Sequence, residues 1–203
     1  MSITHDKMYN GFKINQGATN GKGCRKDILD RYREELSGML QDHSKVMQIR
    51  FDLRYPADGS VPHDPKKVYR FTENMKRKMK RSQYAGGHCA DPRLIKVQEQ
   101  DTSNNPHFHC TLLVNGNALQ SYLPVLKNVV EPLWKQALQT DRSGLVDYCD
   151  NNGENGIMIR RGSSDMQQQI EKCVYQASYM AKVNTKENNP KGTWSSSRNH
   201  RKK

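Results

Sequence analysis

The spacing of apolar residues along the chain predicts four amphipathic helices. In each of them apolar side chains recur every three or four residues, as they do on the buried face of a helix. The expected helices cover residues 26–41, 65–81, 119–139 and 163–183. Asp64 and Pro65 are suited to cap and begin the second helix, and Pro132 is expected to kink or divide the third.

Alternation of apolar and polar residues, by contrast, predicts strands. The clearest one runs from residue 46 to residue 55. Residues 93–100 and 107–115 are predicted as two further strands, and the short polar turn between them favours an antiparallel hairpin. Two shorter strands, at 144–149 and 157–161, are expected to form a second hairpin across a turn-forming segment.

This order of elements predicts an α+β fold. One antiparallel sheet with helices packed mainly on one face is the simplest arrangement for these elements. Residues 26–183 are expected to form this single domain, after a loosely ordered lead-in over residues 1–25. Residues 184–203 are expected to form a basic, weakly ordered tail.

The charge of the chain indicates what kind of partner it binds. Lys and Arg number 33 against 21 Asp and Glu, which gives a net charge of +12. Such an excess is typical of a protein with a polyanionic ligand. Binding to an anionic membrane would favour a lipid-facing helix rich in Trp and Leu, and none stands out. Nucleic acid is therefore the expected partner.

Cysteine content and hydropathy indicate a cytoplasmic protein with no membrane partner. The five cysteines are an odd number without a CxxC pair, which argues against a disulfide framework and a zinc ribbon. No run of about 18 apolar residues is present, so no spanning helix is expected. The polar start over residues 1–6 is unlike a signal peptide.

The strand predicted at 107–115 opens with two histidines one residue apart. Because side chains alternate along a strand, His107 and His109 point to the same side, and the hairpin brings Glu99 opposite them. Two imidazoles and a carboxylate suit Mg²⁺ or Mn²⁺, and the motif offers no plausible cysteine partner for structural zinc. The alternative is that one histidine packs, the other is solvated and Glu99 is a surface carboxylate.

The last predicted helix carries a candidate nucleophile. Tyr175 and Tyr179 are one helical turn apart, and Lys182 shares the face of Tyr179. A phenol with a pKa of about 10 needs a nearby cation and a metal-polarised electrophile to react at neutral pH. Metal ligands, tyrosine, lysine and basic charge together predict attack of a tyrosine hydroxyl on a DNA phosphate. The alternative is that both rings pack against the sheet.

Basic residues outside these motifs are candidate phosphate contacts. They are Lys76, Arg77, Lys80, Arg81, Arg160 and Arg161. The cations between residues 76 and 81 fall in the C-terminal half of a predicted helix. There they would also complement the helix dipole on a solvated face, so the sequence leaves both interpretations open.

Three segments of the chain resemble the HUH endonucleases, the class of rolling-circle replication initiators and relaxases. The segments are Arg50 to Leu53, Glu99 to His109 and Ser178 to Lys182, and they look like the inovirus-type replication proteins of bacterial prophages. The resemblance covers about residues 45–200. It implies that the sheet is an RRM-like HUH palm, which cuts one DNA strand.

The resemblance also implies a role for each candidate residue. His107, His109 and Glu99 would hold the metal, Tyr179 would be the nucleophile and Lys182 its cationic helper. The enzyme would act on single-stranded DNA at a replication origin in the cytoplasm of a bacterial host. It would leave a 5′-phosphotyrosine and a free 3′-OH that primes synthesis. The chain has no Gly-x-x-x-x-Gly-Lys-Ser/Thr loop, so unwinding is expected from a host helicase.

Several alternatives stay open at this point. Tyr175 is either a second nucleophile, as in the two-tyrosine initiators of small phages, or a packing residue. A non-catalytic DNA-binding replication regulator would share the basic charge without needing the histidines and Tyr179. A metal-dependent phosphodiesterase would use the histidine site to activate water and would leave no DNA attached to the protein.

Overall fold

The main feature of the structure is a six-stranded antiparallel sheet. The computed structural model describes residues 2–17, 22–82, 87–100, 105–150, 153, 155–183 and 194–196. The strand order is β10-β6-β7-β5-β8, and β9 also pairs with β5. These strands are β5 (Lys45–Leu53), β6 (Arg93–Glu99), β7 (His107–Asn115), β8 (Val146–Asp147), β9 (Ile157–Arg160) and β10 (Trp194–Ser196). The predicted hairpin of β6 with β7 is confirmed.

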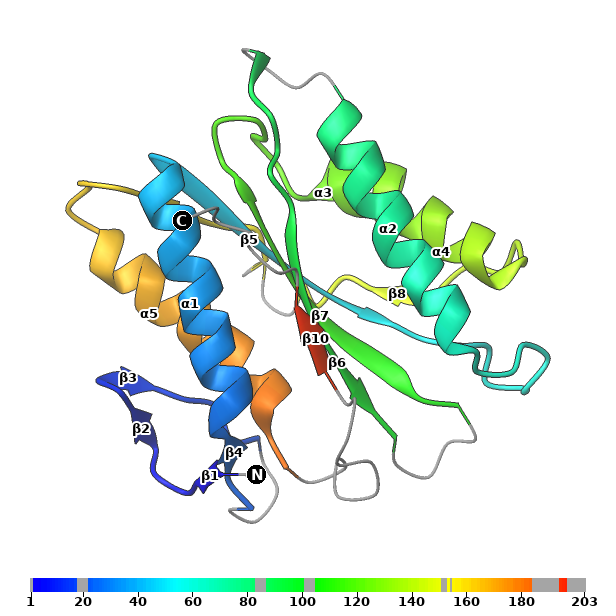
Figure 1. Ribbon diagram of the computed structural model, residues 1–203, viewed down its shortest axis with the longest axis horizontal. Helices are drawn as coiled ribbons and strands as arrows, with labels where there is room; N and C mark the ends of the chain where they lie inside the picture. The colour runs from blue at the N-terminus through cyan, green and yellow to red at the C-terminus, as the bar shows by residue number, and fades with distance from the viewer. Residues whose placement is uncertain are drawn as a thin grey trace, which may run out of the picture.

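Helices cover both faces of this sheet (Figure 1). One face packs against α1 (Lys26–Asp42) and α5 (Met166–Ser178), and the other against α2 (Pro65–Arg81), α3 (Leu123–Val125) and α4 (Glu131–Leu138). The predicted α+β class with one main antiparallel sheet is confirmed. The prediction that helices pack mainly on one face is wrong, because the three longest strands carry buried apolar side chains on both sides.

The core on the α2 side follows the predicted helix patterns closely. Asp64 caps α2 by accepting a hydrogen bond from the backbone N–H of Lys66 at 2.8 Å, and Pro65 opens the helix, as predicted. A π-helical segment, Leu126–Val130, separates α3 from α4 directly before Pro132. This wider turn relieves the clash and missing N–H that Pro132 imposes, so the predicted helix is divided as expected.

The N-terminal residues form ordered short strands over α1 and α5. These are β1 (Ile3–Thr4), β2 (Met8–Tyr9), β3 (Phe12–Lys13) and β4 (Cys24–Arg25), paired β1 with β4 and β2 with β3. Ile14 and Cys24 are buried in the core on this side. The backbone N–H of Asn15 donates to the Ser178 hydroxyl at 2.7 Å. The described residues of this segment therefore differ from the loosely ordered lead-in that the sequence predicted.

The chain after α4 runs along one edge of β5. Both β8 and β9 pair antiparallel with β5, so the predicted hairpin between them is wrong. Asn155 fills the interval between the two strands: its side chain accepts from the Arg50 N–H at 2.9 Å and donates to the Arg50 carbonyl at 2.7 Å. This amide replaces the backbone pairing where the edge strand is interrupted.

The C-terminal part adds an edge strand that the sequence did not predict. β10 pairs with β6, and the Trp194 indole donates to Asp27 at the start of α1 at 3.0 Å. The remainder of the tail, 184–193 and 197–203, lies outside the described residues. Within the described part of the chain, every helix is too short or too polar to span a bilayer.

Candidate metal centre and nucleophile

A line of buried polar side chains crosses the face of the sheet that α1 and α5 cover. Side chains alternate along β5 and β7, so the apolar residues of these strands fill mainly the opposite face. The polar ones are Gln48, Arg50, Asp52, Glu99, His109 and Thr111, each less than a tenth exposed. Buried polar groups need partners. Arg50, Asp52, His109 and Glu99 form a chain of contacts with one another, whereas Gln48 bonds to side chains and a carbonyl of α1 and α5.

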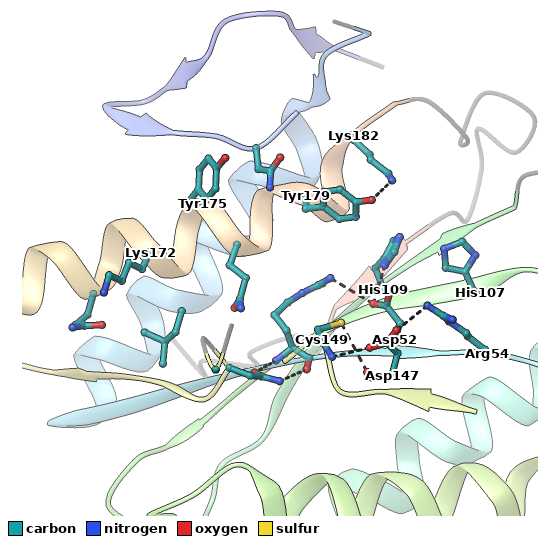
Figure 2. A pocket seen from close by; sticks show the side chains of 17 residues that line it. Asp52, Arg54, His107, His109, Asp147, Cys149, Lys172, Tyr175, Tyr179 and Lys182 are labelled. Atoms are coloured by element: carbon teal, nitrogen blue, oxygen red, sulfur yellow. Dashed lines mark hydrogen bonds and ion pairs between the residues drawn. The ribbon is translucent and has the colours of Figure 1, made fainter. Parts of the chain in front are cut away.

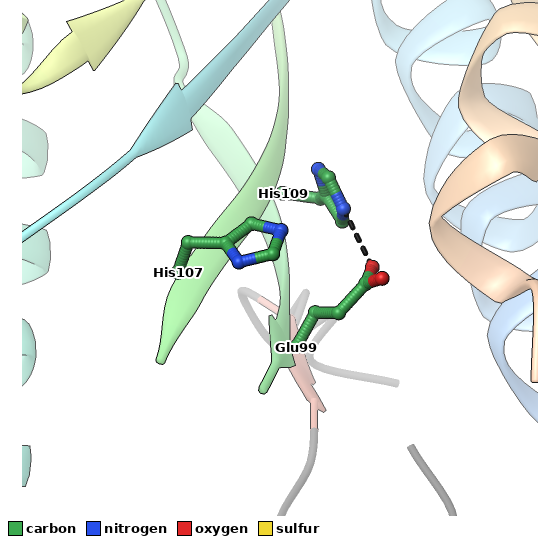
Figure 3. A group of neighbouring side chains, drawn as sticks. All are labelled: Glu99, His107 and His109. Carbon is green, nitrogen blue, oxygen red and sulfur yellow. Dashed lines mark hydrogen bonds and ion pairs between the residues drawn. The ribbon is translucent and has the colours of Figure 1, made fainter. Parts of the chain in front are cut away.

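Three of the predicted site residues meet at one end of this line (Figure 3). One possible ligand atom from each of Glu99, His107 and His109 lies within 4.8 Å of the others. His109 Nε2 is 2.7 Å from Glu99 Oε2, and the two imidazole rings stand edge to face with centroids 4.8 Å apart. Glu99 pairs directly with His107 across the β6–β7 ladder, which explains why these side chains converge.

The donor set fits a divalent cation. Two imidazoles and a carboxylate at this separation supply three ligands and leave further positions for water or substrate oxygens, as Mg²⁺ and Mn²⁺ require. Burial lowers the pKa of His107, and the charge of neighbouring His109 lowers it further despite the nearby carboxylates. A depressed pKa favours the neutral ring that metal coordination needs.

A second carboxylate, Asp52, orients the central histidine. Asp52 Oδ1 lies 2.8 Å from His109 Nδ1, on the opposite side of the ring from Glu99. Burial raises the pKa of Asp52, but the hydrogen bond and charge of His109, with the charge of Arg50, outweigh it and hold the pKa below its usual value. With a metal bound, a carboxylate at Nδ1 would favour the tautomer that leaves Nε2 available as a ligand.

Tyr179 and Lys182 lie beside this cluster, immediately after α5 (Figure 2). The Lys182 ammonium donates to the Tyr179 hydroxyl at 2.6 Å and pairs with Glu99 Oε1 at 3.4 Å. The rings of Tyr179 and His109 stand edge to face at 5.5 Å. Burial lowers the pKa of Lys182, but the hydrogen bond to Tyr179 and the charge of Glu99 outweigh it and raise the pKa, so the ammonium stays charged.

Tyr175 shares the face of α5 with Tyr179 but lies apart from the histidines. In Figure 2 its hydroxyl points away from them, toward the N-terminal strands. Its side chain is 40% exposed, and the Lys13 ammonium sits 5.6 Å from the centre of its ring. The structure therefore brings Tyr179, and not Tyr175, to the candidate metal ligands.

An open groove with a volume of about 860 Å³ runs between α5 and the sheet (Figure 2). The two histidines, both tyrosines and Lys182 line it. Further cations and amides along it come from β5 and the residue after it, from α5, and from the segments that follow β3 and precede β9. They are Arg50, Arg54, Lys172, Gln169, Gln176, Asn15 and Asn155. A cationic, amide-rich groove beside a candidate metal site suits a phosphodiester chain.

The predicted basic contacts lie elsewhere. Lys76, Arg77, Lys80 and Arg81 are on α2, which covers the opposite face of the sheet (Figure 1). Arg161 donates to two carbonyls near the end of α1, which gives it a structural role, and Arg160 is exposed at the end of β9. None of these six side chains lines the groove.

The sequence reasoning missed Asp52 and the groove cations Arg50, Arg54 and Lys172 as site residues. The signal for Arg50 and Asp52 was present, because the alternating strand placed both on one side with Gln48. A polar side of a strand is equally compatible with solvent, and the sequence did not show that α1 and α5 would cover it. Lys172 sits one helical turn before Tyr175 and could have been found by the same spacing argument.

Comparison with known proteins gives a family-level match. A family model described as the YagK/YfjJ C-terminal domain matches residues 4–193 of the chain. This span includes the candidate metal ligands, both tyrosines and the short strands β2, β3 and β4. No curated protein and no solved structure matches the chain.

Proposed function

The chain belongs to the YagK/YfjJ C-terminal domain family of prophage-like bacterial proteins, and we propose that it nicks and rejoins single-stranded DNA. In this proposal it is a rolling-circle replication initiator of the inovirus type and acts at a replication origin in the bacterial cytoplasm. One observation carries the proposal. Lys182 contacts both the Tyr179 hydroxyl and Glu99, so a candidate nucleophile and a candidate metal ligand share one network.

The residues of the site divide the work of strand transfer. His107, His109 and Glu99 would hold Mg²⁺ or Mn²⁺, which as a Lewis acid would polarise the scissile phosphate. Lys182 would hold the Tyr179 oxygen in position through its short charged hydrogen bond. The phenol gives its proton to solvent and its oxygen bonds to phosphorus, while the bond from phosphorus to the 3′ oxygen breaks and that oxygen takes a proton from solvent to become the free 3′-OH.

Joining is the reverse reaction. A 3′-OH, from the same strand or a newly made one, attacks the phosphotyrosine and releases the Tyr179 phenol. Because the ester conserves the energy of the phosphodiester bond, rejoining needs no nucleotide cofactor. The groove cations hold the strand in place between the two steps. Unwinding of the duplex is assigned to a host helicase.

The proposal is tested with single-stranded DNA labelled at its 3′ or its 5′ end, by determining which product carries the label after cutting. We expect a pool of random-sequence single strands, incubated with the protein and Mn²⁺, to form an adduct that survives denaturing electrophoresis. A 3′ label should travel with the protein, and a 5′ label should appear on a free fragment ending in a 3′-OH. Sequencing the attached strands would define the preferred site.

The controls separate this reaction from its alternatives. Tyr179→Phe and chelation should each abolish the adduct, whereas Tyr69→Phe, which alters an exposed tyrosine on α2, should leave it unchanged. Cut DNA without an adduct would instead support a phosphodiesterase that uses water. Binding without any cutting would support a non-catalytic replication regulator.

A further inference from the structure

Tyr175 is an exposed aromatic side chain that the chemistry of the nick does not use. Four large hydrophobic side chains are conspicuously exposed in the described part of the chain: Met8, Tyr69, Leu123 and Tyr175. Of these, only Tyr175 lines the groove. An exposed ring that lines a groove is accessible to a ligand bound in that groove.

The surroundings of Tyr175 differ from those of a nucleophile. Within the described residues its hydroxyl makes no hydrogen bond, whereas the Tyr179 hydroxyl accepts one from Lys182. The cation near Tyr175 is Lys13, which lies over the ring, 5.6 Å from its centre, and not at the oxygen. This arrangement leaves the phenol without activation and presents the ring for stacking.

Lys13 is held in this place by the fold. It ends β3, and the backbone N–H of Asn15, two residues later, is anchored on the Ser178 hydroxyl of α5. The N-terminal strands thus lie over α5 at the level of Tyr175 (Figure 2). Lys13 itself is exposed, so its ammonium can also reach a backbone phosphate in the groove.

We propose that Tyr175, with Lys13, binds an unpaired base of the DNA strand next to the scissile phosphate by stacking. The inference rests on the proposed function for the identity of the strand and assigns Tyr175 a positioning role. Tyr175 precedes Tyr179 by one helical turn, about 6 Å along the axis. A base held there places the neighbouring phosphate at the metal ligands.

The rest of α5 extends this path. Gln169, Lys172 and Gln176 line the groove on the same helix, and the stretch from Gln169 to Lys182 spans about 20 Å. Amide and ammonium groups along that length suit the backbone of several unpaired nucleotides. Stacking on aromatic rings along a cationic groove is how proteins bind single strands with little sequence preference.

The experiment measures binding without cleavage. Fluorescence anisotropy of a labelled oligothymidine, in EDTA so that no metal chemistry occurs, gives the dissociation constant of each variant. Tyr175→Ala should weaken binding by roughly 5- to 150-fold, the range for losing one stacked base. The matched control Tyr69→Ala removes an exposed tyrosine from the opposite side of the sheet and should leave the affinity unchanged. Tyr175→Phe keeps the ring and should restore the affinity.

A second arm locates the base. A single abasic site is placed at each position of the oligonucleotide in turn. The position at which it weakens binding to the wild type marks the stacked base, and there Tyr175→Ala should bind the abasic and the intact oligonucleotide equally well. Equal affinity of Tyr175→Ala and wild type, or an abasic effect that persists in the variant, would overturn the proposal. So would loss of strand joining in Tyr175→Phe with binding intact, which would make Tyr175 a second nucleophile. Failure of the wild type to form any adduct would refute nicking while leaving the stacking result standing.

Discussion

The contact between Asp52 and His109 makes a quantitative prediction about metal affinity. Asp52 touches none of the proposed ligand atoms directly; it faces Nδ1 of His109 at 2.8 Å, while Nε2 faces Glu99. Asp52→Asn keeps an acceptor for the ring but removes the negative charge, and Asp52→Ala removes both. Both variants should therefore weaken metal binding, and the alanine variant should weaken it more.

The expected magnitude follows from the role of such carboxylates. Loss of a partner that orients a metal-bound histidine costs about 10- to 100-fold in affinity, so we expect about tenfold for Asp52→Asn and up to about 100-fold for Asp52→Ala. At saturating Mn²⁺ these factors remove about 1.4 to 2.7 kcal/mol of metal-linked stability. In a domain of this size that corresponds to roughly 3–11 °C of the Mn²⁺-induced rise in melting temperature.

Calorimetric titration with Mn²⁺ and melting curves with and without the ion would measure both quantities. The melting temperature of each variant with Mn²⁺ is compared with that of the same variant without the ion. This difference removes any effect of the substitution on the stability of the metal-free protein. Asp147→Asn is the matched control, because Asp147 faces Asp52 across β5 and β8 in the same groove but pairs with Arg54. Equal weakening by Asp52→Asn and Asp147→Asn would mean that general charge, not orientation of His109, sets the affinity, and would refute the reasoning.

Three further predictions test other parts of the structure. Lys182→Gln removes a charged hydrogen bond at the phenol and should slow single-turnover adduct formation by roughly 10- to 150-fold, and an unchanged rate would rule out its helper role. The logarithm of the single-strand binding constant falls linearly with the logarithm of the salt concentration, and Lys172→Gln, in the groove, should make that slope shallower by about 0.7. Lys80→Gln on α2 should leave the slope unchanged. The reverse result would place the DNA on α2. Asn155→Ala leaves a buried N–H and C=O of β5 unpaired and should lower the free energy of unfolding in urea by about 2–4 kcal/mol, while a loss below about 0.5 kcal/mol would show that water replaces the amide.

The sequence was sufficient to bring the three candidate metal ligands together. A short turn between two alternating strands leaves little freedom in their pairing, so Glu99 had to come opposite the histidine strand. Helical spacing likewise placed Tyr179 and Lys182 together, and the structure has them in contact. These inferences held because each depends on local geometry that a few residues determine.

What the sequence could not supply is the arrangement of elements relative to one another. The amphipathic pattern of α2 shows which side of the helix is buried, but not which face of the sheet the helix covers. The sequence therefore left its cations open between phosphate contacts and a solvated face, whereas the structure puts them on the face opposite the groove. The N-terminal strands have two residues each, too few to show a period. Asn155 replaces backbone pairing by a side chain, which no pattern of apolar residues records.

Glu99 holds the central position in the network, because it connects the candidate ligand His109 to Lys182 and the candidate nucleophile Tyr179. One of its oxygens lies 2.7 Å from His109 and the other 3.4 Å from Lys182, which in turn holds the Tyr179 hydroxyl. Asp52 lies on the other side of His109, so acidic and basic side chains alternate from Asp52 through His109 and Glu99 to Lys182. Because each of these groups is stabilised by the next, a substitution at Glu99 would disturb the ligand set and the phenol together. Effects of single substitutions along this line should therefore be strongly non-additive, as expected for residues that act as one unit.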